Sequence, residues 1–522
     1  MTTGLGARHS ALGTTRYSTT RYAERGGAIL GLLVCAAIAA HAQGVRYQRL
    51  LIKNAIVIDG AGNPARGPLD IWIEGNTIVA IKESAAREPG GSAMAGATPA
   101  GKPDRVIDAA GMTVMPGIID VHVHVQFSRA GQPMPRDYVY KLLLAHGITT
   151  VRDPGSTEGI DTMVAQAKLS AENQIAAPTI LPYATVGANT PAEARALVRQ
   201  AKLKGAKGLK VFIVRPDVWV AISAEAHALD LPIATDLKIQ ETDAIAASRY
   251  GVRSIEHWYG IPDAAIPGPQ DFPDYYVYDN EADRFRWAGD LWRQADPARL
   301  SAVLDTMLAH GVTWDPTFAI YEANRDIQRA RSLPWLAGYA LPQMMAQFEP
   351  DVLRHGSYFF DWTTADEIRW RENYRIWMRW VREYAARGGN VTVGSDAGFI
   401  YALYGFTTIR ELEMQQEAGF QPIEVIQHAT SNGAKALGLT NTGVLRPGFK
   451  ADLLIVDGNP LHDLKVLYAT GIETVVDGKM VHRGGVRFTI KDGIVFDAPA
   501  LAADVREMVR AARAAAPAPT TH

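Results

Sequence analysis

Residues 115–124 read Met115-Pro116-Gly117-Ile118-Ile119-Asp120-Val121-His122-Val123-His124, an apolar run that ends in two histidines separated by one residue. Side chains alternate between the two faces of a β-strand, so His122 and His124 are expected to project to the same face. Two imidazoles on one face can bind a single metal ion at roughly 2.0–2.1 Å. A motif of two histidines around one residue is short enough to occur by chance, but its place at the end of an apolar strand predicts a metal site.

Further apolar runs follow this stretch and alternate with amphipathic helical segments. Continuous apolar strands separated by helices are typical of a parallel sheet that helices cover. We therefore predict a (β/α)8 TIM-like barrel over residues 111–439, a fold that carries its active site at the carboxyl ends of its strands. The strands are expected at Met115–Val123, Thr149–Arg152, Thr179–Tyr183, Gly208–Val214, Pro232–Asp236, Ser254–His257, Val312–Pro316 and Val391–Asp396.

Short β-rich runs lie on both sides of this segment, at residues 45–110 and 440–497. Glycines such as Gly60 and Gly75 mark turns between them. We expect both chain ends to assemble into one small, composite β-sandwich domain. Residues 498–522 are expected to form a C-terminal helix and tail.

Insertions at residues 258–299 and 321–366 interrupt the strand–helix pattern. Both follow strand ends, so both are expected to overhang the mouth of the barrel. Their aromatic side chains either line a substrate pocket or pack a small core of the insertions themselves. The aromatic residues concerned are Tyr275, Tyr276, Tyr278, Phe285, Trp287, Trp292, Trp362, Trp370 and Trp377.

Residues 1–42 have the order of a secretory signal peptide. Arginines precede a small apolar run from Gly26 to Ala40, and Ala40-His41-Ala42 has the A-x-A form of a cleavage site. The run is shorter than the roughly 20 apolar residues that span a bilayer. Cleavage after Ala42 predicts an exported protein, periplasmic or extracellular, with no stable membrane anchor. It would also remove Cys35, the chain's single cysteine.

Composition excludes some classes of partner. The 522 residues carry a formal net charge of -2, and 47% of them are hydrophobic. The chain has no basic surplus, so nucleic acid is not expected as a partner. We expect a small-molecule substrate, and a homo-oligomer is compatible with the sequence.

Three more strands carry residues that could act at the same end of the barrel. Asp396 closes the last strand and could bind metal or accept a proton from a metal-bound water; it could equally cap a helix. His257 ends the sixth strand. Lys210 is the only charged residue in Gly208–Val214, and a lysine in an apolar strand is costly unless it is paired or modified. A carbamate on Lys210 would provide an anionic bridge between two metals.

The motifs together resemble the amidohydrolase superfamily, in particular its exported imidazolonepropionase-like and prolidase-like members. The resemblance covers about residues 50–485, and the motifs occur in the family's order. The segments that carry it are Met115–His124, His146-Gly147-Ile148-Thr149-Thr150-Val151-Arg152-Asp153, Ser254-Ile255-Glu256-His257, Val393-Gly394-Ser395-Asp396 and Gly448-Phe449-Lys450-Ala451-Asp452-Leu453.

This resemblance implies a role for each matching residue. His122 and His124 would bind a first metal together with Asp396, which would also act as the general base. Lys210, carboxylated on its side-chain nitrogen, would bridge to a second metal that His257 binds. One or two divalent ions are implied, with zinc expected and manganese as the alternative.

One position departs from the family pattern. The family usually has histidine at the end of strand 5, whereas this chain has Asp236. We expect Asp236 to be a metal ligand; the alternative is that it only hydrogen-bonds a neighbour and the site holds one metal. Arg152 could bind a substrate carboxylate or pair with an acid at the barrel rim. Tyr259 could contact substrate or only cover the site.

The sequence therefore predicts a hydrolase acting on carbon–nitrogen bonds, in a cyclic amide, an N-acyl amino acid or a short peptide. Two alternatives remain. Asp236 permits a catalytically weakened relative that only binds a metal or ligand. A mononuclear deaminase is the other, but deaminating relatives use a helper glutamate after strand 5, where this chain has Lys238 and Gln240, with Glu241 as the nearest acid.

Overall fold

The computed structural model describes residues 44–84, 101–212, 214–237, 242–268, 272–274, 276–277, 280–351, 356, 359 and 361–515. The expected signal segment at residues 1–42 lies outside this part of the chain, as do Lys238, Gln240, Glu241, Tyr275 and Tyr278. None of the helices in the described residues is both long and apolar enough to cross a bilayer.

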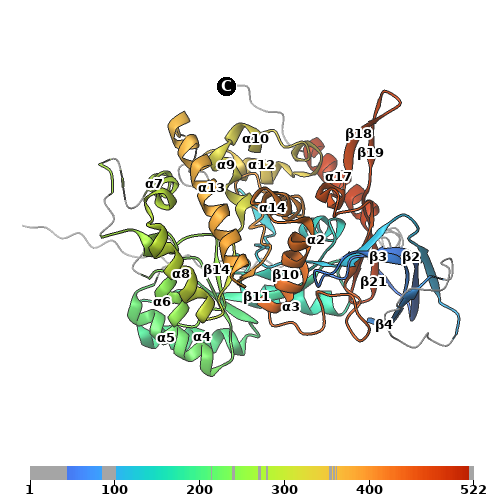
Figure 1. Ribbon diagram of the computed structural model, residues 1–522, viewed down its shortest axis with the longest axis horizontal. Coiled ribbons are helices and arrows are strands. Elements are labelled where there is room, and N and C mark those ends of the chain that lie inside the picture. Colours follow the sequence, from blue (N-terminus) through green and yellow to red (C-terminus); the bar gives the residue numbers. More distant parts are fainter. Residues whose placement is uncertain are drawn as a thin grey trace, which may run out of the picture. The chain divides into compact units, whose positions relative to one another are not determined.

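The larger part of the fold is a parallel eight-stranded sheet that helices cover (Figure 1). Its strands follow one another in chain order, and each falls within or overlaps a strand predicted from the sequence. They are β7 (Ile118–Asp120), β10 (Ile148–Asp153), β11 (Thr179–Val186), β12 (Gly208–Val211), β13 (Ile233–Thr235), β14 (Ser254–Glu256), β15 (Thr313–Asp315) and β16 (Asn390–Val391).

This sheet curls, but its strand ladder does not close. β7 and β16 lie at the two ends of the strand order. Single backbone contacts join these edges: Val121 N–H donates to Val393 O at 2.9 Å, and Asp396 N–H donates to His122 O at 2.7 Å. An isolated parallel bridge between Val123 and Ala397 lies beside these contacts. The closed barrel expected from the sequence is therefore present as a curled sheet whose two edge strands meet without forming a ladder.

The opening stretch of the sequence belongs to two sheets rather than to one strand. β6 (Thr113–Pro116) pairs with strands of the second sheet, and β7 begins the parallel sheet two residues later. Gly117 makes the change of sheet possible, since a Cβ at this position would lie 2.1 Å from Thr149 Oγ1. The prediction of one continuous strand over Met115–Val123 was wrong at this glycine.

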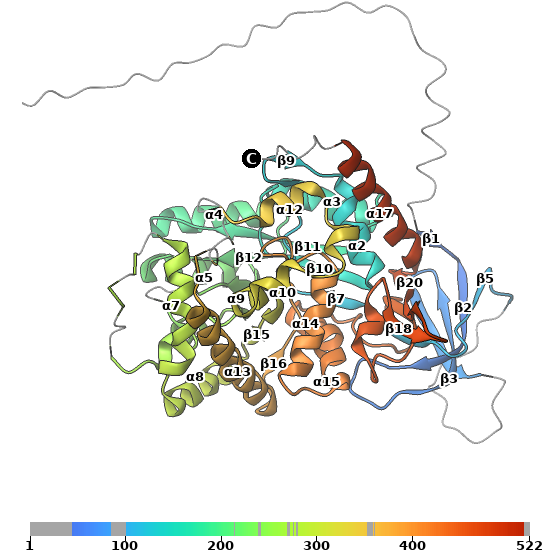
Figure 2. The same ribbon diagram turned by 90° about the horizontal axis from the view of Figure 1, so that it is seen from above.

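Strands from both chain ends form the second sheet, so the expected composite β domain is present (Figure 2). β6 and β17 join the two ends, with Pro116 opposite Leu453. The domain is one mixed nine-stranded sheet around a shared apolar core rather than two separate sheets. Its strands are β1 (Val45–Arg46), β2 (Arg49–Val57), β3 (Arg66–Glu74), β4 (Thr77–Glu83), β5 (Arg105–Asp108), β6, β17 (Leu453–Asp457), β20 (Gly485–Lys491) and β21 (Ile494–Asp497).

Two short hairpins stand outside these sheets. They pair β8 (Ser128–Arg129) with β9 (Gln132–Pro133), and β18 (Ile472–Val476) with β19 (Lys479–Arg483). The second hairpin had been expected within the β-sandwich. It carries exposed Val475 and Met480 instead of a buried apolar face.

Helices connect the strands of the parallel sheet and cover its outer face (Figure 1). The C-terminal helix α17 packs against α2. The α-helices are α2 (Arg136–Ala145), α3 (Ile160–Ala171), α4 (Pro191–Leu203), α5 (Pro216–Ala228), α6 (Ala244–Arg249), α7 (Glu281–Gln294), α8 (Pro297–Ala309), α9 (Glu322–Arg325), α10 (Ile327–Arg331), α11 (Leu336–Tyr339), α12 (Pro342–Phe348), α13 (Thr364–Ala386), α14 (Phe406–Glu417), α15 (Pro422–Gln427), α16 (Gly433–Ala436) and α17 (Ala498–Ala515). Shorter helical turns lie at Asp263–Ala265, Phe318–Tyr321, His428–Asn432 and Leu464–Leu467.

The aromatic residues of the two insertions pack mainly on one another. Trp370 stacks on Tyr321 with ring centroids 5.9 Å apart and on Trp362 at the same distance. Trp258, at the start of the first insertion, also contacts Trp370 and Trp377. Within the described residues, these contacts favour the packing alternative over a substrate pocket, but the core they form is continuous with that of the barrel.

Candidate metal centre

Every residue that the sequence analysis assigned to a metal site lies at the carboxyl end of the curled sheet. These side chains line one cavity of about 290 Å³. The wall of the cavity also contains the aromatic residues Phe212 and Phe399 and the polar residues Gln126 and Thr157. The predicted metal residues in the wall are His122, His124, Lys210, Asp236, His257 and Asp396.

His122, His124 and Asp396 form a compact triangle of donor atoms. The two Nε2 atoms are 3.3 Å apart, and Asp396 Oδ1 lies 3.6 Å from His122 Nε2 and 3.3 Å from His124 Nε2. Ligand bonds of about 2.0–2.2 Å in tetrahedral geometry place neighbouring donor atoms roughly 3.3–3.6 Å apart. The triangle therefore has the dimensions of three ligands around one metal ion.

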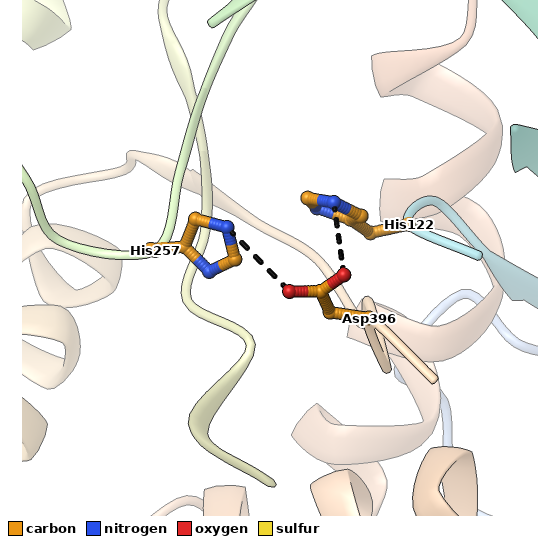
Figure 3. Close-up of side chains that lie close together, drawn as sticks. All are labelled: His122, His257 and Asp396. Carbon is orange, nitrogen blue, oxygen red and sulfur yellow. Dashed lines mark ion pairs between the residues drawn. The ribbon is translucent and has the colours of Figure 1, made fainter. Parts of the chain in front are cut away.

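His257 and Asp236 form a second group on the other side of Asp396. His257 Nε2 lies 3.6 Å from Asp236 Oδ2 and 3.8 Å from Asp396 Oδ2. The two oxygens of Asp396 thus face different histidines, Oδ1 toward His122 and Oδ2 toward His257 (Figure 3). This arrangement has room for one metal position on each side of the carboxylate.

Hydrogen-bond partners fix which nitrogen of each imidazole is available to a ligand. His124 Nδ1 lies 3.3 Å from Gly155 O, which can only accept a hydrogen bond. His257 Nδ1 contacts Thr317 Oγ1, whose own hydroxyl donates to Pro316 O at 2.7 Å. Both Nδ1 atoms therefore carry the proton, and both Nε2 atoms present lone pairs to the cavity, as metal ligation requires.

The backbone is strained where the donor residues lie. His257, Thr317 and Asp396 have φ values of 59°, 49° and 48° at the ends of three neighbouring strands. The left-handed region is uncommon for residues other than glycine, and it persists where the surroundings hold the chain in place. Here His257 N–H donates to Asp315 O at 2.7 Å. The side chains of His257 and Asp396 line the cavity, and that of Thr317 contacts His257 Nδ1.

Electrostatics at the site favour a bound cation. Burial lowers the pKa of His257 to about 4 and also lowers that of His124. Burial alone would lower the pKa of His122 too, but carboxylates led by Asp396 outweigh it and raise this pKa to about 9. Carboxylates this close attract positive charge to the imidazole of His122. Imidazole nitrogens and carboxylate oxygens around one cavity are the ligands that a divalent ion such as zinc takes, so these residues fit a metal.

Asp396 is ionised in this setting. Burial would raise its pKa, but the imidazoles of His122, His124 and His257 hold the pKa of this carboxyl well below its usual value. An ionised carboxylate with each oxygen facing a different histidine can ligate a metal and can accept a proton.

Lys210 lies on β12 and is fully buried. Its Nζ has no hydrogen-bond partner among the described residues, and the nearest anion, Glu256 Oε2, lies 3.8 Å away. A buried ammonium with one distant partner is costly. The geometry is compatible with the carboxylation expected from the sequence, which stays a prediction.

Arg152 and Tyr259, the predicted substrate-binding residues, do not line the cavity. Arg152 is buried and donates to Glu256 and, at 2.9 Å, to Ser254 Oγ. This contact matches the ion-pair alternative rather than the substrate role. The hydroxyl of Tyr259 lies 2.9 Å from that of Tyr321, and its ring packs on His257 with centroids 5.8 Å apart.

Sequence reasoning missed two buried acids beneath the cavity. Glu256 and Asp315 lie inside β14 and β15, and both are fully buried. His122 Nδ1 lies 2.7 Å from Glu256 Oε2 and 3.6 Å from Asp315 Oδ2. A charged residue within an apolar strand was the signal that singled out Lys210, and the same signal would have found both acids.

Known proteins resemble this chain in sequence and in fold. The adenine deaminase of Lysinibacillus sphaericus (strain C3-41) is 24% identical over 450 residues, covering 84% of this chain and 60% of the deaminase. A 5-methylthioadenosine/S-adenosylhomocysteine deaminase of Desulfitobacterium hafniense (strain DSM 10664 / DCB-2) is 34% identical over 118 residues. That match covers 19% of this chain and 27% of the deaminase, so it spans about a quarter of that relative's length.

Solved structures show the same fold at low sequence identity. A Xaa-Pro dipeptidase with bound methionine aligns with a TM-score of 0.59 and 20% identity, covering 86% of this chain and 100% of that one. Bottromycin amidohydrolase aligns with a TM-score of 0.62 and 18% identity, covering 92% and 94%. The model of the amidohydrolase family matches residues 113–481, which include every residue of the metal centre described above, so this chain belongs to the amidohydrolase family.

Proposed function

We propose that the protein is a metal-dependent hydrolase that cleaves a carbon–nitrogen bond of a small molecule. The observation that carries this proposal is the convergence of the Nε2 atoms of His122, His124 and His257 on the two oxygens of Asp396. Family membership supports it, but the fold alone would not, because related folds host many chemistries.

Each residue has a distinct task in this proposal. His122, His124 and Asp396 would hold the first ion, and His257 with Asp236 would hold a second. A divalent ion in such a site polarises a carbonyl group and lowers the pKa of water. Asp396 would accept the proton of the attacking water and pass it to the leaving nitrogen.

Carboxylated Lys210 would lie between the two ion positions in this proposal. Its side chain lines the cavity together with His124 and His257. A carbamate there would provide the anionic bridge and remove the cost of a buried ammonium. Zinc is the expected ion, and manganese is the alternative that the extra carboxylate of Asp236 would favour.

The cavity wall supports an amide substrate with an apolar group beside the scissile bond. Phe212 and Phe399 provide apolar surface, whereas Gln126 and Thr157 can hydrogen-bond an amide. Aromatic surface of this kind binds apolar side chains, and a few polar groups fix orientation. The substrate classes proposed are therefore N-acyl amino acids and short peptides, with cyclic amides as the third. We further propose that the mature protein is exported, on the signal-like order of residues 1–42.

A substrate screen tests the proposal directly. The purified chain, reconstituted with zinc or manganese, is assayed against dipeptides, N-acyl amino acids and cyclic amides. We expect turnover that a chelator removes and that added metal restores. The Asp396→Asn variant is the matched control, since it keeps the size of the side chain. Absence of bound metal after reconstitution would refute the proposal.

Deamination is a second candidate, favoured by the deaminases among the sequence relatives. Adenine and 5′-deoxyadenosine derivatives therefore belong in the same screen, with ammonia release as the readout. Ammonia from these compounds without cleavage of any amide would assign the protein to the deaminases.

A further inference from the structure

A buried ionic cluster lies directly beneath the metal centre, with Glu256 at its middle. Glu256 Oε2 accepts from Arg152 Nη2 and lies 2.7 Å from His122 Nδ1. Glu256 Oε1 accepts from Ser254 Oγ at 2.6 Å, and Lys210 Nζ is 3.8 Å from Oε2. One carboxylate thus contacts residues from the first, second, fourth and sixth strands of the parallel sheet.

The three histidines of the site differ in what faces Nδ1. A carbonyl oxygen, Gly155 O, faces that of His124, and a hydroxyl, Thr317 Oγ1, faces that of His257. Only the Nδ1 of His122 faces carboxylates, Glu256 at 2.7 Å and Asp315 at 3.6 Å. Among the described residues no aligned hydrogen bond reaches His122 Nδ1, so this structure shows a close contact with Glu256 rather than a formed hydrogen bond.

His122, Glu256 and Asp315 are close enough to one another to be considered as ligands of a separate metal ion. The surrounding charges oppose that assignment. Arg152 already occupies the position from which a cation would balance Glu256. Using Nδ1 for such an ion would also leave no place for the imidazole proton when Nε2 binds the metal above. The cluster therefore supports His122 rather than binding an ion of its own.

We propose that Glu256 is a positioning residue that keeps the proton of His122 on Nδ1 and so directs the Nε2 lone pair to the first metal. The inference rests on the proposed metal-dependent function and assigns a residue that does not itself touch metal or substrate. A carboxylate acceptor behind a ligating imidazole fixes its tautomer and orientation and increases its basicity as a ligand. His122 is then the strongest nitrogen donor of the three.

Arg152 holds the Glu256 carboxylate in place and balances its charge in this arrangement. Its Nη2 donates to Glu256, its Nη1 donates to Ser254 Oγ at 2.9 Å, and its Nε donates to Val121 O. These contacts connect the guanidinium to the backbone just before His122. If Lys210 becomes a carbamate, its positive charge disappears, and Arg152 is left as the permanent counterion of Glu256.

The test compares Glu256→Gln with Glu322→Gln. Both substitutions change a buried, arginine-paired carboxylate into an amide of the same size. Glu322 pairs with Arg410 at 2.6 Å and does not line the metal cavity. Zinc affinity is measured by competition with a chromophoric chelator, and the visible absorption of Co²⁺ bound to each variant reports the ligand field.

We expect Glu256→Gln to weaken binding of the first metal by about 10–100-fold, the usual range for loss of such a partner. Its Co²⁺ spectrum should also shift. Glu322→Gln should match the wild type in both measurements. Ser254→Ala, which removes the hydroxyl that supports Glu256 Oε1, should give a smaller loss of affinity in the same direction and supplies a second reading if Glu256→Gln does not fold.

Wild-type affinity and an unchanged Co²⁺ spectrum in Glu256→Gln would overturn the inference while leaving the proposed function intact. Equal losses in Glu256→Gln and Glu322→Gln would also overturn it, because they would indicate a general effect of buried charge on folding. A wild-type chain that binds no metal would overturn both the inference and the proposed function.

Discussion

Two buried arginine–glutamate pairs in this molecule have similar burial but different surroundings. Between α9 and α14, Arg410 Nε donates to Glu322 Oε2 at 2.9 Å and Nη2 donates to Oε1 at 2.6 Å, which makes a bidentate pair. Arg329 lies 3.5 Å from Glu322, and Glu413 lies 3.4 Å from Arg410. Beneath the metal centre, Glu256 divides its contacts between Arg152, His122 and Lys210. The first pair joins two helices, whereas the second joins strands that carry donor residues.

The two pairs differ in the polar atoms around them that lack a hydrogen-bond partner. Around Glu256, His122 Nδ1, Lys210 Nζ and Asp315 Oδ2 have no aligned hydrogen-bond partner within the described part of the chain. Buried polar atoms without partners are rare and usually have a reason, such as an ion or a modification that completes them. Incomplete pairing therefore separates the charges around Glu256 from the bidentate pair between α9 and α14.

The largest effect is expected from Asp396→Asn. This change removes the charge that faces all three imidazoles and the proposed proton acceptor. We expect kcat/KM to fall by about 10⁴-fold, which corresponds to ~5.5 kcal/mol of transition-state stabilisation. Steady-state kinetics on any substrate found in the screen measures it. Retention of more than a tenth of the wild-type rate would show that Asp396 is not the base.

Glu322→Ala should break the pair between α9 and α14, which reduces the stability of the fold and leaves metal binding unchanged. Removal of Glu322 leaves the buried Arg410 guanidinium with only the longer contact to Glu413 at 3.4 Å, and breaking a buried pair costs about 3–5 kcal/mol. The midpoint of urea unfolding should fall, while zinc stoichiometry of the folded protein stays unchanged. Loss of metal from a variant that remains folded would contradict the division between the two pairs.

The third prediction concerns a buried histidine outside the site. Burial lowers the pKa of His146 to about 4, and its Nδ1 donates to Leu142 O at 2.7 Å. Because the folded-state pKa lies below the unfolded value of about 6.5, the unfolded chain binds the extra proton first, and stability falls as the pH drops from about 6.5 to 4. The loss from this residue is about 3 kcal/mol.

His146→Asn keeps a donor for the Leu142 carbonyl but cannot titrate. Chemical unfolding at several pH values should show a flatter decline for this variant between about pH 6.5 and 4, even if it is less stable at neutral pH. A decline as steep as that of the wild type would assign the acid sensitivity to other groups.

The strands, and the meeting of the proposed donor residues in one cavity, could be predicted from the sequence because each leaves a local signal. Apolar runs marked the strands, and His122, His124, His257 and Asp396 follow such runs directly. The change of sheet at Gly117 left no such signal, because it depends on the close approach of Thr149, which is distant in the chain.

Arg152 shows the main limit of that reasoning. A charged residue at a strand end looks the same in sequence whether it faces a substrate or an internal partner. Its direction is decided by Glu256 and Ser254, which lie four strands away along the chain. Pairings between distant strands can be read only from the fold.

The smallest expected effect concerns Asp236, where the chain departs from its family. Its Oδ2 lies 3.6 Å from His257 Nε2, and its side chain lines the cavity. As a ligand, Asp236 would add a negative charge to those of Asp396 and carboxylated Lys210. Oxygen ligands and higher negative charge favour harder ions, so Asp236 should increase the preference for manganese relative to zinc.

Asp236→His should reverse that preference. We expect the ratio of zinc to manganese affinity to rise about tenfold, or ~1.4 kcal/mol, with metal competition as the measurement. Asp236→Asn is the matched control, because it keeps the shape of the side chain but removes its charge. If Asp236→Asn and Asp236→His give the same ratio of zinc to manganese affinity, the charge of Asp236 sets the preference between the two metals. If both retain the wild-type ratio and stoichiometry, Asp236 is not a ligand, and the second ion position must depend on His257 and Lys210 alone.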